Sequence, residues 1–185
     1  MLLAWKHTTV IGHAITVWRG LGAGQVATVC DGQNEAVLRE LGRLGFPKES
    51  VIMNARPEDG MFGSIRCAAR WEGWNSSLSH WIISLGDQPH LRPETFGRLI
   101  EQAGLEPERI WQPSRGGKAR HPVLLPRRVF LELAGAKDAT LRDFLEARGG
   151  ERSLFESDDA GLDLDLDTRE DYERARRRME GGSEV

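Results

Sequence analysis

Short apolar runs along the chain alternate with segments whose apolar residues recur at the spacing of one helix face. Strands are predicted at residues 25–30, 51–53, 80–85, 110–111, 123–125 and 153–155, where β-branched and aromatic residues gather. Helices are predicted at residues 8–19, 35–44, 64–71, 95–103, 129–133, 141–147 and 169–178. This alternation predicts an α/β fold, with a doubly wound, mostly parallel sheet and helices on both faces.

The 185 residues match the size of one ordinary domain, and the sequence contains no internal repeat, low-complexity segment or long linker. We therefore expect a single domain over residues 1–180. The ends of the chain, residues 1–6 and 181–185, are expected to be mobile, and residues 181–185 to form a disordered tail.

Positive and negative side chains nearly balance, with 25 Lys and Arg against 28 Asp and Glu and a net charge of −3. Nucleic-acid-binding proteins usually carry a basic excess, so this balance argues against nucleic acid as a partner. The basic run from Arg174 to Arg178 is interpreted as the solvated face of a helix. No apolar stretch approaches the roughly 18 residues of a membrane span and no signal-peptide pattern opens the chain, which predicts a cytoplasmic protein without a membrane partner.

The two cysteines give no indication of cysteine chemistry. Cys30 and Cys67 lack a CxxC spacing and a partnering histidine, which argues against zinc and against a disulfide framework. Each lies in an apolar pattern, so both are interpreted as small buried residues of a reducing compartment.

Asp87 is the strongest candidate for chemistry, because it follows an apolar strand and a glycine, with Pro89 just beyond it. The ligands of open parallel sheets bind at the carboxyl ends of the strands. A carboxylate in that place suits a Mg²⁺ ion that bridges to substrate phosphates. The alternative is an Asp that shapes an ordinary turn or caps the next helix.

A second acidic cluster comprises Asp163, Asp165 and Asp167, which alternate with leucines and therefore share one face. Such a face is either exposed to solvent or converges on a cation. Thr168 and Asp171 also form a capping-box pattern, with Asp in place of the usual Glu, that would start the last helix.

A loop with glycines precedes the helix predicted at residues 64–71. It runs from Asn54 through Gly60 to Ser64, at the start of that helix. The free N–H groups of a helix start suit an anion or a sugar hydroxyl. The alternative is that Ser64 only caps the helix.

A cationic loop follows the strand predicted at residues 110–111. Residues 115–120 combine two glycines with lysine and arginine, and His121 comes next, before a proline. Such a loop suits phosphates or an acidic ligand. The alternative for His121 is a polar residue at the edge of a loop.

Taken in order, segments spread over nearly the whole chain resemble the family of molybdenum-cofactor nucleotidyltransferases, especially its cytidylyltransferase branch. The segments are Leu2-Leu-Ala-Trp5 with His13-Ala-Ile, Asn54…Gly60-Met61-Phe-Gly-Ser64, Leu85-Gly-Asp-Gln-Pro89, Arg120-His-Pro-Val-Leu124 and Asp165-Leu-Asp-Thr168…Asp171-Tyr172. The Asp-Gln-Pro, His-Pro-Val and Asp-Leu-Asp-Thr elements are specific when they occur in this order. The fold of the family is the doubly wound sheet predicted above.

The resemblance implies transfer of a cytidylyl group from CTP to a molybdopterin-type substrate. The terminal phosphate of the pterin would attack the α-phosphate of CTP, and pyrophosphate would leave. Asp87 and Asp167 would be the catalytic residues and would hold a Mg²⁺ ion that screens the phosphates. The other positions carried over from the family are Asn54, Gly60 and Ser64 on the nucleotide side and Arg120 and His121 on the pterin side.

The family opens with a strand and a Gly-rich loop of the form L-A-A-G-x-S-x-R-M-G, followed by a lysine, which would lie immediately before Leu2. Gly20-Leu-Gly-Ala-Gly24 has a similar composition, but it follows a helix and precedes a strand, so it is interpreted as a helix stop and turn. Either the natural reading frame begins before Met1, or the short protein has lost nucleotide transfer. We expect the first, and a mass near 20.7 kDa for the protein from its host would contradict it.

Without that segment, we expect a sheet that lacks its first central strand and a 185-residue form with little or no transferase activity. The strands around Val26 and Ile82 are expected to pair directly or to be completed by a neighbouring chain, in a homo-oligomer that covers the exposed edges.

Two other functions are open. One is a sugar-phosphate or purine-pathway nucleotidyltransferase on the same scaffold; the other is a non-catalytic module that holds a molybdopterin intermediate or docks on a molybdoenzyme.

Overall fold

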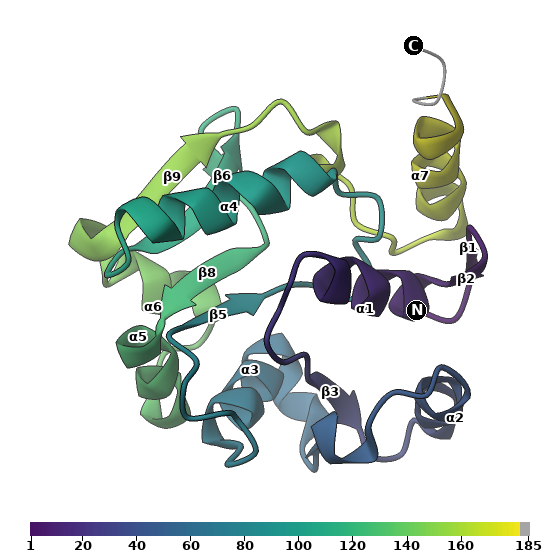
Figure 1. Cartoon of the computed structure of the whole chain (residues 1–185), viewed down its shortest axis with the longest axis horizontal. Helices are drawn as coiled ribbons and strands as arrows, with labels where there is room; N and C mark the ends of the chain where they lie inside the picture. The colour runs from purple at the N-terminus through teal and green to yellow at the C-terminus, as the bar shows by residue number, and fades with distance from the viewer. Residues whose placement is uncertain (182–185) are drawn as a thin grey trace.

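The computed structural model describes residues 1–181, with strands and helices in the alternating order that the apolar pattern predicts (Figure 1). The strands are β1 (Ala4–Trp5), β2 (Thr8–Thr9), β3 (Thr28–Asp31), β4 (Val51–Asn54), β5 (His80–Ile83), β6 (Ile110–Arg115), β7 (Lys118–Ala119), β8 (Val123–Pro126) and β9 (Arg152–Glu156). The helices are α1 (Val10–Gly20), α2 (Glu35–Arg43), α3 (Gly60–Arg70), α4 (Pro93–Leu105), α5 (Arg127–Glu132), α6 (Leu141–Glu146) and α7 (Arg169–Gly181). Within this part of the chain, none of the helices has the length and apolar character that crossing a membrane requires.

The larger of two main sheets is organised around β8, which lies between β5 and β6 and is antiparallel to both. Because β9 pairs with β6 in parallel, β5, β6 and β9 all run in the same direction. The short β7 forms a hairpin with β6. A second sheet pairs β3 with β4 in parallel. The predicted α/β fold with a central sheet and helices is confirmed; β5, β6 and β9 share one direction, and β7 and β8 run in the opposite direction.

The two sheets are separate. Within residues 1–181, β3 pairs only with β4, and β5 pairs only with β8. Direct pairing between the strands around Val26 and Ile82 was one of two predicted arrangements, and it does not occur; Val26 itself lies before β3. The separation agrees with the predicted lack of a central strand, and completion by a neighbouring chain stays a prediction.

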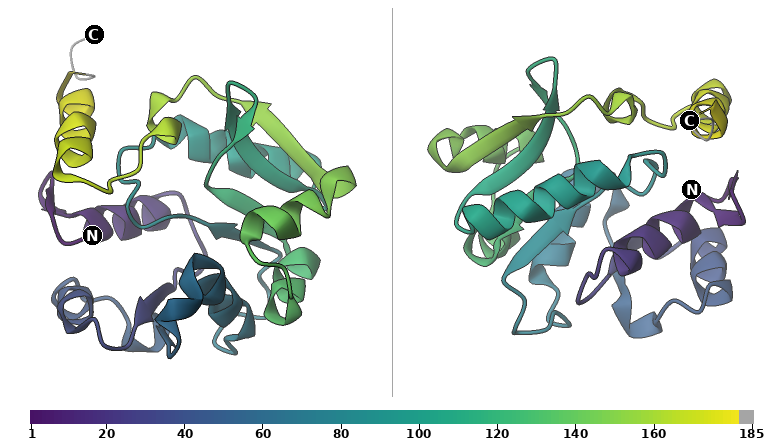
Figure 2. Two further views of the ribbon diagram at one scale, coloured as in Figure 1. Left: turned by 180° about the vertical axis from the view of Figure 1, so that it is seen from behind. Right: turned by 45° about the horizontal axis from the view of Figure 1, so that its top comes forward.

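Helices cover both faces of the larger sheet, because successive residues of a strand point to opposite sides. On one face, α4 packs over β6 and β8 through Leu99, Trp111 and Leu124. On the other face, α3, α5 and α6 pack over Val123 and Leu125. Accordingly, α4 lies in front of the sheet in Figure 1, and α5 and α6 come forward in the reverse view of Figure 2. Each fully buried aliphatic or aromatic side chain contributes roughly 1.5–3 kcal/mol to this packing.

The N-terminal segment is packed, and the prediction that residues 1–6 are mobile is wrong. β1 and β2 form a hairpin next to α7 (Figure 1). The indole of Trp5 is buried against Val10, Leu164 and Ala175. In addition, the hydroxyl of Tyr172 on α7 donates a hydrogen bond to the backbone carbonyl of this hairpin. The error arose because a two-residue strand is too short to leave an alternating pattern.

Several element bounds differ from the predicted ones. The predicted loop over residues 115–120 contains the last residue of β6 and all of β7. α3 begins at Gly60 rather than at Ser64, because Gly60 has a φ of 71° that turns the chain into the helix. α7 ends at Gly181, the first residue of the predicted tail, and residues 182–185 lie outside the described residues.

Replacing Trp5 by alanine should lower the free energy of unfolding by about 3–5 kcal/mol, because it leaves a cavity in the cluster between β1 and α7. Trp5 is 2% exposed, whereas Leu3 is 50% exposed, so Leu3→Ala is the matched control. The control should change the free energy by less than about 0.5 kcal/mol. Urea denaturation followed by circular dichroism measures both. Equally small changes would show that the hairpin is not packed.

Candidate functional site

Asp87 lies in the turn that follows β5, at the carboxyl end of that strand. Its Oδ1 is buried and has no hydrogen-bond partner among residues 1–181. Burial raises the pKa of the Asp87 carboxyl, and the carboxylates of Asp165 and Asp167 raise this pKa further. The buried Asp87 oxygen lacks a hydrogen-bond partner and is repelled by two other carboxylates. A bound cation would stabilise its negative charge.

The acidic segment after β9 shows the predicted alternation. Leu162 and Leu164 are buried, whereas Asp163, Asp165 and Asp167 are exposed. The three carboxylates have different surroundings. Asp165 Oδ1 accepts a hydrogen bond of 2.8 Å from Gln88 Nε2, which links this segment to the residue after Asp87. Asp163 instead forms ion pairs with Arg115 and Arg120 on the other side.

The predicted capping box at the start of α7 is present. Thr168 Oγ1 accepts a hydrogen bond from the backbone N–H of Asp171, and the Asp171 carboxylate accepts one from the backbone N–H of Thr168. These bonds start the helix one residue after Thr168. They also fix the chain just beyond Asp167.

Asp159, which the sequence analysis missed, positions the acidic segment of the candidate site. Its carboxylate is only 3% exposed, and it accepts hydrogen bonds from the backbone N–H of Arg92 at 2.9 Å, from Thr95 Oγ1 at 2.8 Å and from the backbone N–H of Gly161 at 2.9 Å. Arg92 and Thr95 lie at the start of α4, so one carboxylate joins that helix to the acidic segment. Asp158 precedes it with the same side chain, and nothing local distinguishes the two in the sequence.

His90 completes the connection between the two loops. Its Nε2 donates a hydrogen bond of 3.1 Å to the carbonyl oxygen of Gly161. A Cβ at Gly161 would lie 2.9 Å from Asp159 Oδ1 and 3.2 Å from the carbonyl oxygen of His90, so only glycine fits. We use the name clasp for Asp159, His90 and Gly161. The clasp holds the loop after β5 against the segment that carries Asp165 and Asp167.

Arg120 and His121, which were predicted to contact the substrate, are adjacent in sequence but differ in their surroundings. The Arg120 guanidinium bonds to Asp163 through Nε and Nη2. The His121 ring is half-buried, and its Nδ1 has no partner among residues 1–181. Burial lowers the pKa of His121, and the charges of Asp165 and Asp87 oppose this shift. The charges of Asp165 and Asp87 therefore influence the protonation of His121. Arg120 is the residue that precedes His121 in the chain.

The structure brings Asn54 and Ser64 together, on the predicted nucleotide side. Asn54 ends β4, and its Nδ2 donates a hydrogen bond of 3.1 Å to Ser64 Oγ. The Asn54 Oδ1 accepts a hydrogen bond of 2.9 Å from the backbone N–H of Arg56. These bonds fix the loop that leads to Gly60 and the start of α3. The Asn54 side chain thus shapes this loop.

A metal ion would need oxygen ligands from outside the protein. Among residues 1–181, no group of three or more His, Cys, Asp or Glu side chains is arranged to hold a metal ion. Mg²⁺ in phosphoryl-transfer sites is usually held by one or two carboxylates, water and substrate phosphates. Asp87 and a carboxylate from the acidic segment fit that kind of site, and they do not fit a closed structural site.

A family model described as the MobA-like NTP transferase domain matches residues 1–154. A search of curated proteins found no match. Among solved structures, the chain is similar to Rv0371c of Mycobacterium tuberculosis H37Rv in complex with manganese, at 25% identity over 94% of this chain and 89% of that chain, with a TM-score of 0.66. A nucleotidyl transferase from Methanothermobacter has a TM-score of 0.80 at 18% identity, over 98% of this chain and 85% of that chain.

Molybdopterin-guanine dinucleotide biosynthesis protein A from Archaeoglobus fulgidus is also similar, with a TM-score of 0.64 at 15% identity, over 97% of this chain and 90% of that chain. The likeness to this protein and to the one from Methanothermobacter shows a shared fold. The share of each chain that is covered shows that the likeness extends over nearly the whole molecule.

Asp159→Ala should lower the free energy of unfolding by about 2–4 kcal/mol, because it leaves buried N–H and O–H donors without an acceptor. Asp158→Ala is the matched control, because the Asp158 side chain is 92% exposed. It should change the free energy by less than about 0.5 kcal/mol. Thermal and urea unfolding measure both variants. A loss of similar size for the two would show that Asp159 does not hold the loops together.

Acid should destabilise the protein below about pH 6.5, because burial lowers the pKa values of His13, His90 and His121 from the usual 6.5. The unfolded chain binds protons at these histidines before the folded protein does, so the free energy of unfolding falls as the pH is lowered. His90→Gln should flatten this fall, and His7→Gln on the exposed surface should not. Urea unfolding at a series of pH values, in the presence of a chelator, provides the measurement. A steeper fall for His90→Gln would contradict the assignment.

Proposed function

Because the chain belongs to the MobA-like NTP transferase family, we propose that its site serves the transfer of a nucleotidyl group from a nucleoside triphosphate to an acceptor molecule. The expectation of little or no activity for the 185-residue form stays a prediction. The observation that carries this proposal is the buried Oδ1 of Asp87, which lacks a hydrogen-bond partner in the described chain. Asp165 and Asp167 add negative charge around it. Its position at the carboxyl end of β5 is where α/β sheets of this kind bind their ligands.

Asp87 and Asp167 are proposed to hold a Mg²⁺ ion together with phosphate oxygens of the substrate. When bound, the ion would neutralise the phosphates and stabilise the charge that develops at the α-phosphorus. The similar Mycobacterium tuberculosis protein was solved with manganese, which supports a divalent cation here. Gln88 holds Asp165 beside this pair, so the negative potential extends along the acidic segment.

The proposed reaction forms a bond between an acceptor oxygen and the α-phosphorus and breaks the bond to the pyrophosphate leaving group. The residues described here bind and orient the reactants, and no protein nucleophile is needed. The buried Nδ1 of His121 has no partner, which supports its proposed contact with the acceptor. On the other side, the loop held by Asn54 and Ser64 presents the start of α3 to the nucleotide.

The proposed nucleotide is CTP and the proposed acceptor is a molybdopterin-type compound. The choice of CTP rests on the likeness of the segment Leu85-Gly-Asp-Gln-Pro89 to the cytidylyltransferase branch. The choice of acceptor rests on the resemblance of segments over nearly the whole chain to the molybdenum-cofactor nucleotidyltransferases. The proposed site would accept other nucleotides as well, because its carboxylates would reach the phosphates through the metal ion and would not contact the base. Nucleotide preference is therefore a separate measurement from metal dependence.

Asp87→Asn should weaken the binding of Mn²⁺ and of Mg-CTP at least tenfold, because it removes the charge that holds the cation. The same variant should keep or raise the free energy of unfolding, by up to about 1 kcal/mol, because it also removes a buried carboxylate without a partner. Isothermal titration calorimetry and thermal unfolding measure the two effects. Asp138→Asn, a carboxylate outside the proposed site, is the control and should change neither.

Unchanged Mg-CTP binding by Asp87→Asn would place the nucleotide elsewhere and contradict the proposal. Titrations with GTP and with sugar phosphates separate the cytidylyltransferase from other transferases on this scaffold. Binding of a pterin phosphate without any nucleotide dependence would favour the non-catalytic module instead.

A further inference from the structure

The larger sheet ends at β9, on the side away from β5 (Figure 1). Within residues 1–181, β9 pairs only with β6, so no strand covers its outer edge. An open edge presents backbone N–H and C=O groups to which another strand can bond, and proteins usually protect such edges. The edge of β9 is therefore either covered by side chains or open to another chain.

Alternate residues of β9 direct their backbone groups away from β6. The N–H of Ser157 donates a hydrogen bond of 2.8 Å to the carbonyl oxygen of Ser114, so this position faces β6. In a parallel pair each residue directs its N–H and its C=O to the same side, and the side alternates along the strand. The backbone groups of Arg152, Leu154 and Glu156 consequently face outward, at the free edge of the sheet.

Two arginines occupy the ends of this edge and leave its centre open. Nη1 of Arg98, on α4, donates a hydrogen bond of 2.8 Å to the carbonyl oxygen of Glu156. Nη2 of Arg109, just before β6, donates one of 3.3 Å to the carbonyl oxygen of Arg152. Between them, no side chain among residues 1–181 bonds to the outward backbone groups of Leu154, whose side chain is 43% exposed.

Side chains of β9 itself hold both arginines in place. The Arg98 guanidinium lies 4.6 Å from the centre of the Phe155 ring, a cation–π contact. Arg109 Nε donates a hydrogen bond of 2.6 Å to Ser153 Oγ. Arg98 and Arg109 therefore cap the edge carbonyl groups and oppose the approach of another strand. We use the name caps for these two arginines.

The outward positions of β9 are complementary to those of a second copy of the same strand. If two β9 strands pair in antiparallel orientation with Leu154 opposite Leu154, Arg152 of each copy lies opposite Glu156 of the other. These three side chains share one face, because alternate residues of a strand point to the same side. Opposite charges directly across an antiparallel pair are stabilising. A twofold axis through Leu154 gives the closed symmetry of most dimers.

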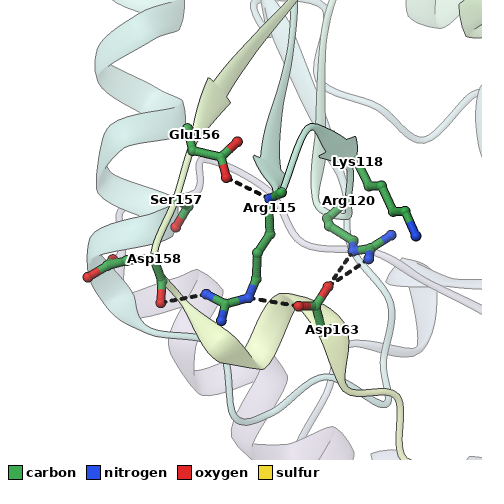
Figure 3. Close-up of a pocket in the computed structure, with 8 residues that line it drawn as sticks. Arg115, Lys118, Arg120, Glu156, Ser157, Asp158 and Asp163 are labelled. Atoms are coloured by element: carbon green, nitrogen blue, oxygen red, sulfur yellow. Dashed lines mark hydrogen bonds and ion pairs between the residues drawn. The ribbon is translucent and has the colours of Figure 1, made fainter.

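Both charges of this pair are already present on that face. The Glu156 carboxylate accepts hydrogen bonds of 2.7 Å from Ser114 Oγ and 2.6 Å from the backbone N–H of Gly116, which fix it beside the β6–β7 hairpin (Figure 3). Arg152 Nε donates a hydrogen bond of 2.7 Å to Gln112 Oε1, and Arg152 forms no ion pair within residues 1–181. Burial lowers the pKa of Arg152. A carboxylate from a second copy would supply the countercharge that Arg152 lacks.

We propose that the edge of β9 is a binding surface for a second copy of this chain, and that the caps, Arg98 and Arg109, hold it closed. In the pair, two hydrogen bonds join the backbone groups of the two Leu154 residues, and release of the caps frees the carbonyl oxygens of Arg152 and Glu156 for further bonds. This surface lies at the opposite edge of the larger sheet from β5, so it is separate from the completion between β3 and β5 that the sequence predicts.

The first test removes the caps and measures self-association by sedimentation equilibrium. Arg98→Ala combined with Arg109→Ala should strengthen dimerisation at least tenfold over the unaltered chain, because the edge carbonyl groups become free to pair. Adding Leu154→Arg to this variant should abolish the gain, because like charges then face each other at the axis. Arg39→Ala with Arg169→Ala, which removes two exposed arginines of α2 and α7, is the matched control and should change nothing.

The second test keeps both caps and reports the register. Residues directly opposite in a hydrogen-bonded antiparallel pair have Cα atoms about 5.5 Å apart, a separation that a disulfide can span. Under mild oxidation, Leu154→Cys should therefore form a covalent dimer. Leu131→Cys, at a leucine of α5 with 48% exposure, is the control and should not. The unaltered chain, with Cys30 and Cys67, gives the background.

Three results would overturn this assignment. The first is self-association that does not increase when the caps are removed. The second is a gain that survives Leu154→Arg, which would place the interface elsewhere. The third is an equal yield of covalent dimer from Leu154→Cys and Leu131→Cys. If the variant without caps does not fold, the yields of covalent dimer decide alone.

Discussion

The buried carboxylate of Asp159 is the constraint on which the site depends. It accepts hydrogen bonds from the start of α4 and from the segment after β9, so two parts of the chain far apart in sequence share one acceptor. His90 and Gly161 close the same contact from the other side. A buried charge is stable only when its hydrogen bonds are complete, and three donors meet that requirement here. The acidic segment is therefore held in one place relative to the loop after β5.

That placement brings the acidic segment beside two other parts of the chain, the loop after β5 and the β6–β7 hairpin. Toward β5, the charges of Asp165 and Asp167 raise the pKa of Asp87, one of whose oxygens is buried without a hydrogen-bond partner among residues 1–181. Toward the β6–β7 hairpin, Asp163 forms ion pairs with Arg115 and Arg120. One short segment that alternates between leucine and aspartate therefore contacts both the loop after β5 and the hairpin.

Much of this site could be predicted from sequence, where the signal is local. The position of Asp87 after an apolar strand, the alternation around Asp165 and the capping box of Thr168 depend only on neighbouring residues. Asp159 could not be predicted, because Asp158 has the same side chain and only tertiary contacts distinguish them. The burial of Trp5 was missed for a similar reason, since its partners lie at the other end of the chain. The ion pairs of Asp163 with Arg115 and Arg120 depend on a hairpin that was predicted as a loop.

The central claim is that Asp87 and the acidic segment share a divalent cation. Crystals of the chain grown with Mn²⁺ and CTP, measured at a wavelength where manganese scatters anomalously, test this directly. The account predicts an anomalous peak for a manganese ion that is coordinated by carboxylate oxygens of Asp87 and Asp167 and by a phosphate oxygen. A manganese ion bound at Asp163 or elsewhere, with Asp87 free of it, would contradict the account.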